Sequence, residues 1–406
     1  MTAIRRLLYA GLFLWPVVIA AQENSPSPYS YFAIGDIRYG DISRISGMAS
    51  TAVSLSGRTL LNTANPASLS ALDSNLFIFD LTGSLRGSQL RSGQDVQNAF
   101  SANFTGFTAG LRISPRWSAA MTLQPYSTVS YNVEYKEYVE GTEILLPTLY
   151  AGSGGVTRLS FLNSFRFSEK FSVGADMMLL LGNIDRDVTR SGITINRNSS
   201  AAQLSFVAGL QYREKISEGL SLTAGAVYGH SCDLDFQNTL LVREESGDIL
   251  LNDVIAATSA DIPRSYGAGI SMAGRRLVIA TDYRYQRWSL SKDRYPGFSF
   301  TDTHRFSGGI MYRPAHFATG NLLSALEYQA GFAFSNSYLT INGVNPVRYE
   351  ISAGTGIPFR NGSQINLGFS WGREGTTAEG LIREDYLRVT LGFSLAEKMF
   401  FKRMYE

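Results

Sequence analysis

Three histidines, His230, His304 and His316, are the side chains of this sequence best suited to proton transfer near neutral pH. A hydrolase would need a serine nucleophile beside one of them, and the chain has no Gly-x-Ser-x-Gly turn. His304 is the candidate for a serine–histidine pair on the lipid face of a barrel, because such partners meet in space rather than in sequence. A polar residue at a membrane interface explains His304 more simply, and we expect no enzymatic activity.

Paired carboxylates offer a second kind of chemistry. Asp185 with Asp187, and Asp233 with Asp235, stand two residues apart in segments expected to be outer loops. Such pairs could hold a divalent ion that bridges lipopolysaccharide, although solvated loop charges are the simpler interpretation. The glycine-rich run 152–155 lacks the lysine of a phosphate loop. We therefore expect no metal site, no nucleotide site and no cofactor.

The overall composition limits the classes of partner that the protein is expected to bind. The formal net charge is +2, so nothing suggests a nucleic-acid partner. The single cysteine, Cys232, excludes an intramolecular disulfide. Arginine outnumbers lysine, which would suit bidentate contacts with the phosphates of lipopolysaccharide.

The N-terminus has the pattern of an export signal. Arg5 and Arg6 precede an apolar run from Leu7 to Ala21, which ends on small residues suited to a signal peptidase. The run is shorter than the roughly 20 residues that a spanning helix needs. We predict a signal peptide over residues 1–21 and export from the cytoplasm.

Alternating apolar and polar residues follow in many short runs. Between Leu204 and Arg213, and again between Leu387 and Leu395, one face is leucine, valine or aromatic and the other is polar or glycine. We expect about fourteen strands, and their predicted starts lie near residues 76, 100, 117, 156, 171, 200, 219, 264, 275, 302, 322, 346, 363 and 382.

The connections between these strands alternate in length. Short turns fall at 114–116, 169–170, 214–218, 273–274 and 360–362, and an intermediate one at 314–321. Long connections are expected at about 86–99, 129–155, 185–199, 231–263, 288–301, 335–345 and 373–381. A water-soluble sandwich has no reason for this alternation, whereas membrane barrels combine short periplasmic turns with long outer loops. The prediction is an all-β fold, a transmembrane antiparallel β-barrel whose two ends lie on the periplasmic side.

Residues 22–73 do not alternate, yet they contain many apolar side chains, among them Ile34, Ile45, Val53 and Leu61. A disordered tail would contain fewer apolar residues. We expect this segment to pack inside the lumen as a hatch or plug, with the barrel over residues 74–406.

Two of the expected outer loops are partly apolar. One contains Ile144, Leu145, Leu146 and Leu149, and the other contains Leu250, Leu251 and Ile255. Exposed leucines in water are unfavourable, so these residues should pack together or form a site. They could form an outer groove that captures amphipathic molecules, or they could fold down and serve only as caps.

Several motifs resemble those of the FadL-type outer-membrane transporters, the family of long-chain fatty-acid and aromatic-hydrocarbon channels. Asn65-Pro66-Ala67 stands just before the first expected strand, as in that family, and Ser46-Gly47-Met48-Ala49 is similar to its small-residue hatch sequence. The segment 27–36, together with the basic-aromatic ending 399–403, is similar to Bacteroidetes relatives.

The resemblance implies a movable hatch and a lateral gap in the wall, at an inward kink of the third strand. That strand contains Pro125 and Tyr126, and a proline removes one hydrogen-bond donor from a sheet. Pro125 either marks this kink or simply marks the outer end of the strand.

The resulting functional hypothesis is a monomeric outer-membrane channel for hydrophobic, fatty-acid-like molecules, in contact with membrane lipid and lipopolysaccharide. The alternative is an attachment platform for a secretion or surface-protein complex, with the same architecture. A general porin for polar solutes fits poorly with a hydrophobic hatch.

Overall fold

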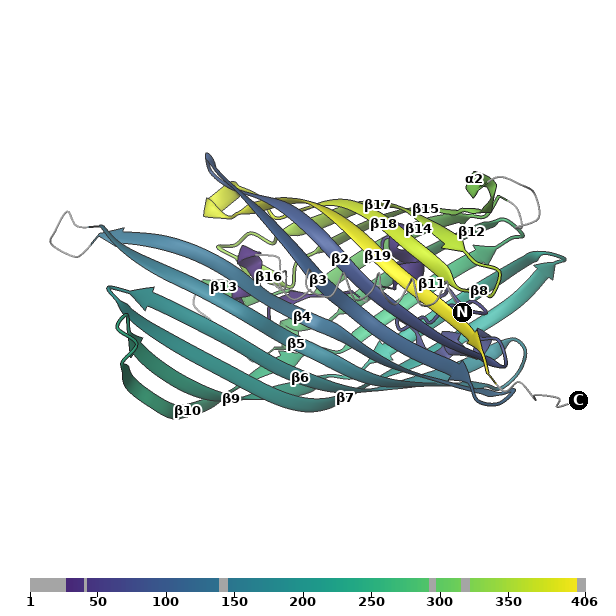
Figure 1. Cartoon of the computed structure of the whole chain (residues 1–406), viewed down its shortest axis with the longest axis horizontal. Helices are drawn as coiled ribbons and strands as arrows, with labels where there is room; N and C mark the ends of the chain where they lie inside the picture. Colours follow the sequence, from purple (N-terminus) through teal and green to yellow (C-terminus); the bar gives the residue numbers. More distant parts are fainter. Residues whose placement is uncertain (1–26, 40–41, 139–144, 292–296, 315–321, 400–406) are drawn as a thin grey trace, which may run out of the picture.

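Fourteen antiparallel wall strands form the body of the protein in a computed structural model (Figure 1). The structure describes residues 27–39, 42–138, 145–291, 297–314 and 322–399, and the predicted signal peptide lies outside them. Two wall strands are interrupted, one between β8 and β9 and one between β10 and β11. In chain order the wall consists of β2 (Leu76–Ser92), β3 (Asp95–Arg112), β4 (Trp117–Tyr138), β5 (Leu145–Arg166), β6 (Phe171–Arg190), β7 (Ile193–Ser217), β8 (Leu220–Gly229) with β9 (Cys232–Glu244), β10 (Ile249–Ile262) with β11 (Ser265–Ala273), β12 (Leu277–Gln286), β14 (Thr303–Tyr312), β15 (Glu327–Asn336), β17 (Val347–Pro358), β18 (Gln364–Glu374) and β19 (Arg383–Lys398).

The last strand closes the barrel on the first. β19 pairs with β2 from Lys398 opposite Leu76 to Arg383 opposite Arg91. The pairing of the first strand with the last leaves neither of them as an unpaired end of the sheet, as a membrane barrel requires. The predicted fold, a closed antiparallel barrel of fourteen strands, is confirmed.

Wall strands present apolar side chains outward and polar side chains inward. On β7, Leu204, Phe206 and Leu210 are exposed on the outer surface, whereas Ser205 and Gln211, on the opposite face of the strand, are buried. This is the alternation of a barrel with lipid outside and a polar lumen. Among the described helices, none is long and apolar enough to cross a membrane.

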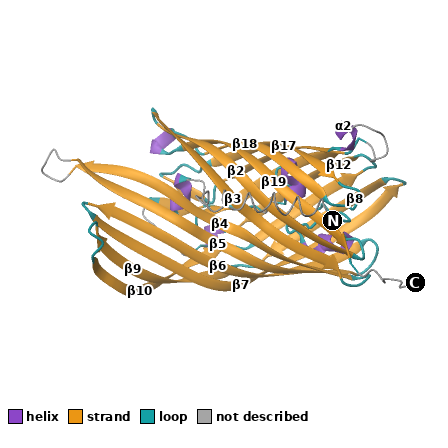
Figure 2. Cartoon of the chain, in the orientation of Figure 1, coloured by secondary structure: helices purple, strands orange, loops and turns teal. Residues whose placement is uncertain are grey.

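The N-terminal segment, defined here as the described residues between 27 and 75, runs along the inside of the barrel (Figure 2). It contains three 3-10 helices and a two-residue strand, and η2 packs against the inner faces of β15, β17, β18 and β19. The exact limits of a plug domain stay a prediction. The elements are η1 (Pro28–Tyr31), β1 (Asp36–Ile37), η2 (Ser43–Met48) and η3 (Pro66–Ala71).

Four of the expected long loops are wrong, because the strands continue through them. The segments 86–99, 129–155, 185–199 and 231–263 form tall hairpins made by β2–β3, β4–β5, β6–β7 and β9–β10. Neither face of these hairpins is consistently apolar. The alternation of apolar and polar residues that marks the lipid-facing part of each strand is therefore lost in them. Cross-strand pairing still satisfies their backbone hydrogen bonds, and the strands therefore extend beyond the membrane.

Other connections contain small elements. The stretch 288–301 contains η4 (Trp288–Leu290) and β13 (Phe298–Phe300), and β13 pairs with β16 (Leu339–Ile341). The connection before β19 contains η5 (Ala378–Gly380), and a short helix, α2 (Leu322–Ala325), replaces the expected start of a strand at 322.

Candidate functional site

The wall opens between β3 and β4. These strands pair only from Arg112 opposite Ser118 to Phe107 opposite Leu123, and β3 then continues to Asp95 with β2 alone. On β4 the pairing with β5 shifts by one residue between Pro125 and Ser127, which is a β-bulge. A bulge bends the strand that carries it, and Pro125 has no N–H to donate. The pairing of β3 with β4 therefore ends two residues before the proline.

The free edge of β4 is taken by the N-terminal segment. β1 pairs with it, Asp36 opposite Thr128 and Ile37 opposite Ser127. Ser27 donates its backbone N–H to the carbonyl of Ser130 at 2.8 Å, on the same edge. The opening in the wall is thus covered from the inside by residues 27–38.

Glycine is required where this segment meets β4. Gly35 has a φ of +90°, and a Cβ built there would lie 2.3 Å from the carbonyl oxygen of Thr128. A side chain would push the segment away from the strand edge.

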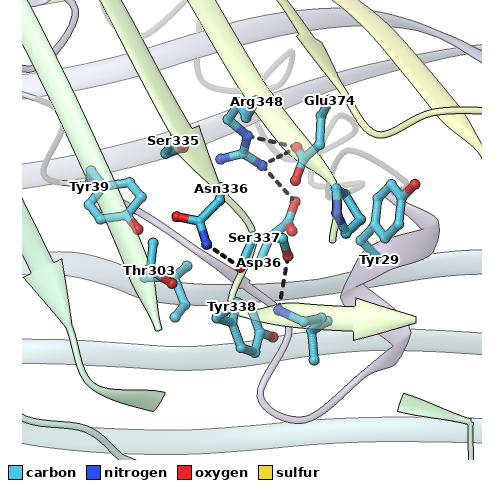
Figure 3. A pocket seen from close by; sticks show the side chains of 13 residues that line it. Tyr29, Asp36, Tyr39, Thr303, Ser335, Asn336, Ser337, Tyr338, Arg348 and Glu374 are labelled. Carbon is cyan, nitrogen blue, oxygen red and sulfur yellow. Dashed lines mark hydrogen bonds and ion pairs between the residues drawn. The ribbon is translucent and has the colours of Figure 1, made fainter. Parts of the chain in front are cut away.

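An ion cluster fixes β1 to the far wall. Arg348 of β17 lies between Glu374 of β18 and Asp36, with 3.7 Å between its guanidinium and the Asp36 carboxylate (Figure 3). The polar cavity beside it has a volume of about 30 Å³. That is room for roughly one water molecule.

Next to this cluster, Tyr29 of η1 donates its hydroxyl to the carbonyl of Ile382 at 2.7 Å. Burial first, and then the nearby Glu374, raise the pKa of the Tyr29 phenol above its ordinary value. The phenol therefore stays protonated and remains a donor. This hydrogen bond ties η1 to the start of β19.

The small-residue stretch of η2 sits directly on wall backbone. The N–H of Gly47 donates to Gln329 at 3.0 Å, and its carbonyl accepts from the Ser352 hydroxyl at 2.8 Å. A Cβ on Gly47 would lie 2.5 Å from the backbone nitrogen of Gly354, and Met48 is fully buried. This close approach to the wall backbone explains why a glycine stands at position 47.

The Asn-Pro-Ala motif docks near the periplasmic end. Asn65 caps η3 by accepting from the N–H of Ala67 at 3.1 Å, and donates to the carbonyls of Val53 at 2.8 Å and Leu210 at 3.1 Å. A Cβ on Gly209 would lie 2.2 Å from the Asn65 side-chain oxygen. The Asn65 side chain thus forms hydrogen bonds both within the N-terminal segment and to the wall strand β7, whereas a residue that only forms a turn would bond within the segment alone.

Sequence reasoning missed a second anchor. Asp282 of β12 accepts from the backbone N–H groups of Ala52 and Val53, at 2.6 and 2.8 Å. Asp282 and Ala52 are 230 positions apart, and the only signal was a carboxylate on the polar face of a strand.

An apolar cavity of about 300 Å³ opens at the outer mouth, between η1 and the top of the wall. Next to this cavity, Tyr31 packs edge-on against Tyr131, with the ring centres 5.1 Å apart. The lining comes from Pro28, Tyr29, Tyr31, Phe32, Val133, Tyr135, Tyr150, Ile341, Gly380, Leu381 and Ile382. Val133 and Tyr135 belong to the portion of β4 that has left β3, so the cavity lies beside the wall opening.

The BamG family model matches residues 3–406, nearly the whole sequence. The chain belongs to the BamG family. Among curated proteins no match was found.

Solved structures similar to this BamG-family chain include two toluene transporters and a FadL homologue, each with low sequence identity. The Pseudomonas putida toluene transporter TodX is 17% identical with a TM-score of 0.61, over 89% of this chain and 100% of that one. The Ralstonia pickettii toluene transporter TbuX is 14% identical with a TM-score of 0.59, over 89% and 100%. A Pseudomonas aeruginosa FadL homologue is 13% identical with a TM-score of 0.59, over 89% and 98%.

The resemblance to FadL-type barrels is therefore confirmed for the fold. The family model that matches is a different one, BamG, and the Bacteroidetes subgroup stays a prediction. The similar solved structures are transport channels, not enzymes.

The expected capture residues of this BamG-family chain do not form a groove together. Leu145 and Leu149 are exposed on β5, Leu146 lies between them, and Ile144 is outside the described residues. Leu250, Leu251 and Ile255 lie on β10, and β6, β7 and β9 stand between the two groups. Neither group lines the apolar cavity, which residues of η1 line together with residues of β4, β5 and β16 and of the connection before β19.

The histidine and aspartate side chains that were candidates for catalysis or metal binding form hydrogen bonds with neighbouring side chains. His304 accepts from or donates to the Tyr283 hydroxyl at 2.8 Å, within a belt of outward aromatic residues. Asp185 and Asp187 accept from the Asn198 and Asn196 side chains across β6 and β7. Within the described ranges, no group of three or more His, Cys, Asp or Glu could hold a metal ion.

Proposed function

We propose that this protein is an outer-membrane channel for small hydrophobic molecules. The observation that carries the proposal is the aromatic cavity of about 300 Å³ beside the opening between β3 and β4. An apolar cavity of about 150 Å³ already holds benzene in another protein. This cavity is therefore large enough for a single aromatic ring or a segment of an alkyl chain.

In this proposal the molecule enters at the outer mouth and leaves sideways between β3 and β4. The route is covered by residues 27–38, so these must move from the edge of β4 during passage. Two of the similar solved structures, TodX and TbuX, are toluene transporters, which supports a cargo of this class.

Ligand binding tests the proposal. Protein purified from its own outer membrane in mild detergent would be examined by native mass spectrometry with lipid extraction. We expect a long apolar or aromatic molecule that is lost when Tyr31 and Leu381 are both replaced by serine. Serine at Leu145 and Leu149 is the matched control, because these leucines are outside the cavity. Loss in the control but not in the cavity variant would contradict the proposal.

A second candidate is an attachment platform, and one observation favours it. The cavity beside Arg348 has a volume of about 30 Å³, and elsewhere the N-terminal segment hydrogen-bonds to Gln329 of β15, Asp282 of β12 and Ser352 of β17. A permanently closed barrel would serve as a scaffold. It would copurify with a stoichiometric protein partner and contain no ligand.

A further inference from the structure

One part of the outer wall, separate from the β2–β3 hairpin, is a sheet with two side edges. Beyond the membrane, β4, β5, β6, β7, β9 and β10 stay paired in that order. A belt of outward aromatic rings marks the membrane level below it, with Phe206 stacked on His230 and Tyr228 beside Tyr266. β9 begins at Cys232 and β10 ends at Ile262, close in sequence to His230 and Tyr266 of this belt, so we place their hairpin outside the lipid. The hairpin lies at the end of the barrel away from the C-terminus (Figure 1).

The two edges of this sheet differ. The edge of β4 is covered by β1 and Ser27. Among the described strands, β10 pairs only with β9, from Ile249 to Ile262. Strand β12 pairs with β11 and ends at Gln286, opposite Ser265, so its pairing does not reach β10. On its other side β10 presents backbone C=O and N–H groups that fit one more strand, although the N–H of Val254 now donates to the Asp253 side chain at 2.8 Å and must exchange that partner for the added strand.

Side chains on both faces of β10 favour a partner over water. Val254 is 75% exposed, and Leu250 and Leu251 are about half exposed. Val254 lies on the outer face, opposite Thr239, whereas Ile255 shares the inner face with its buried partner Asn238. The regular stretch from Leu251 to Ile255 lies between two bulges and is five residues long. A short added strand would cover apolar side chains on both faces.

The charge of the β9–β10 hairpin indicates which kind of strand would bind to this edge. Residues 232–262 contain seven carboxylates and one arginine, and Asp253 lies within the regular stretch itself. A second copy of the same hairpin, or the phosphates of lipopolysaccharide, would be repelled. A segment with lysine or arginine among apolar residues would be attracted.

We propose that the β10 edge of the outer hairpin docks an extended, cationic segment of another protein at the cell surface, by addition of a strand. Backbone hydrogen bonds along Leu251–Ile255 provide the affinity, and the carboxylates of the hairpin select basic side chains.

The test is photo-crosslinking of the full chain in its own outer membrane, with p-benzoylphenylalanine placed at Asn252 or at Val254. Thr239 is the matched control, because it faces outward opposite Val254 but lies one strand in from the edge. We expect one protein adduct from both edge positions. The attachment points should differ by two residues within a segment that contains lysine or arginine, as in a paired strand. Thr239 should give about tenfold less adduct.

A charge reversal adds a second readout. Asp253→Lys should lower the adduct from Val254 by about tenfold, whereas Glu134→Lys on β4 should leave it unchanged. Adducts with lipopolysaccharide, with a second copy of the chain, or with several proteins in no common register would each overturn the proposal.

Discussion

Asp282, on wall strand β12, accepts a hydrogen bond at 2.8 Å from the backbone N–H of Val53 in the N-terminal segment. The same carboxylate accepts from Ala52. One inward side chain thus replaces the strand partner that this stretch of the segment lacks. Other wall side chains also form hydrogen bonds with the backbone of the N-terminal segment, namely Gln329, Ser352 and Ser164.

Removal of this carboxylate should loosen the segment. Asp282→Ala leaves two buried N–H groups without an acceptor, which costs about 1–3 kcal/mol for each group. We expect faster hydrogen exchange at residues 50–56 and a higher single-channel conductance in planar bilayers. Asp253→Ala, in the outer hairpin, should change neither. Unaltered exchange at 50–56 would show that Asp282 is not an anchor.

A side chain at Gly209 should displace the Asn-Pro-Ala motif. In Gly209→Val the new atoms meet the side-chain oxygen of Asn65, so η3 cannot keep its place. Overpacking of this kind costs about 1–3 kcal/mol. We expect a lower temperature at which the folded, fast-migrating band is lost on an unheated gel. Gly87→Ala is the control, because nothing lies within 4 Å of its added carbon. Equal loss in both variants would refute the docking role.

Restoring a donor at Pro125 should narrow the wall opening. In Pro125→Val the strand regains an N–H and a residue that favours sheet pairing. We expect slower uptake of a fluorescent fatty acid, by about severalfold, with unchanged amounts of barrel in the membrane. Pro358→Val, at the periplasmic end of β17, is the matched control. If both variants transport at the wild-type rate, the lateral route is wrong.

Most of the wall could be predicted from the sequence. The predicted starts at 117 and 171 coincide with those of β4 and β6, because a turn with polar or proline residues precedes a run that alternates. The heights of the hairpins could not be predicted, because beyond the membrane neither face has to be apolar. Strand β10 is an example, since both its faces are exposed.

The site could be predicted only where a local motif marks it. Asn65 and Gly47 were found through their neighbours in sequence, and they do lie against the wall. The ion cluster and the Asp282 anchor were not found, since Arg348 and Asp36 are more than 300 residues apart and look like ordinary lumen polar residues. Leu145 and Leu250 were chosen for apolar character alone, and pairing along the hairpins keeps them apart.

The most direct test of the channel proposal is uptake through a barrel whose N-terminal segment can be locked. Asp36 and Thr128 are paired across β1 and β4. Paired positions of this kind are close enough for a disulfide. Asp36→Cys with Thr128→Cys, in a Cys232→Ser background, would be assayed for uptake of a fluorescent fatty acid with the bond oxidised and then reduced. We expect uptake to be lost in the oxidised protein and to return on reduction. Equal uptake in both states, or none in the unaltered protein, would contradict a channel that opens by movement of this segment.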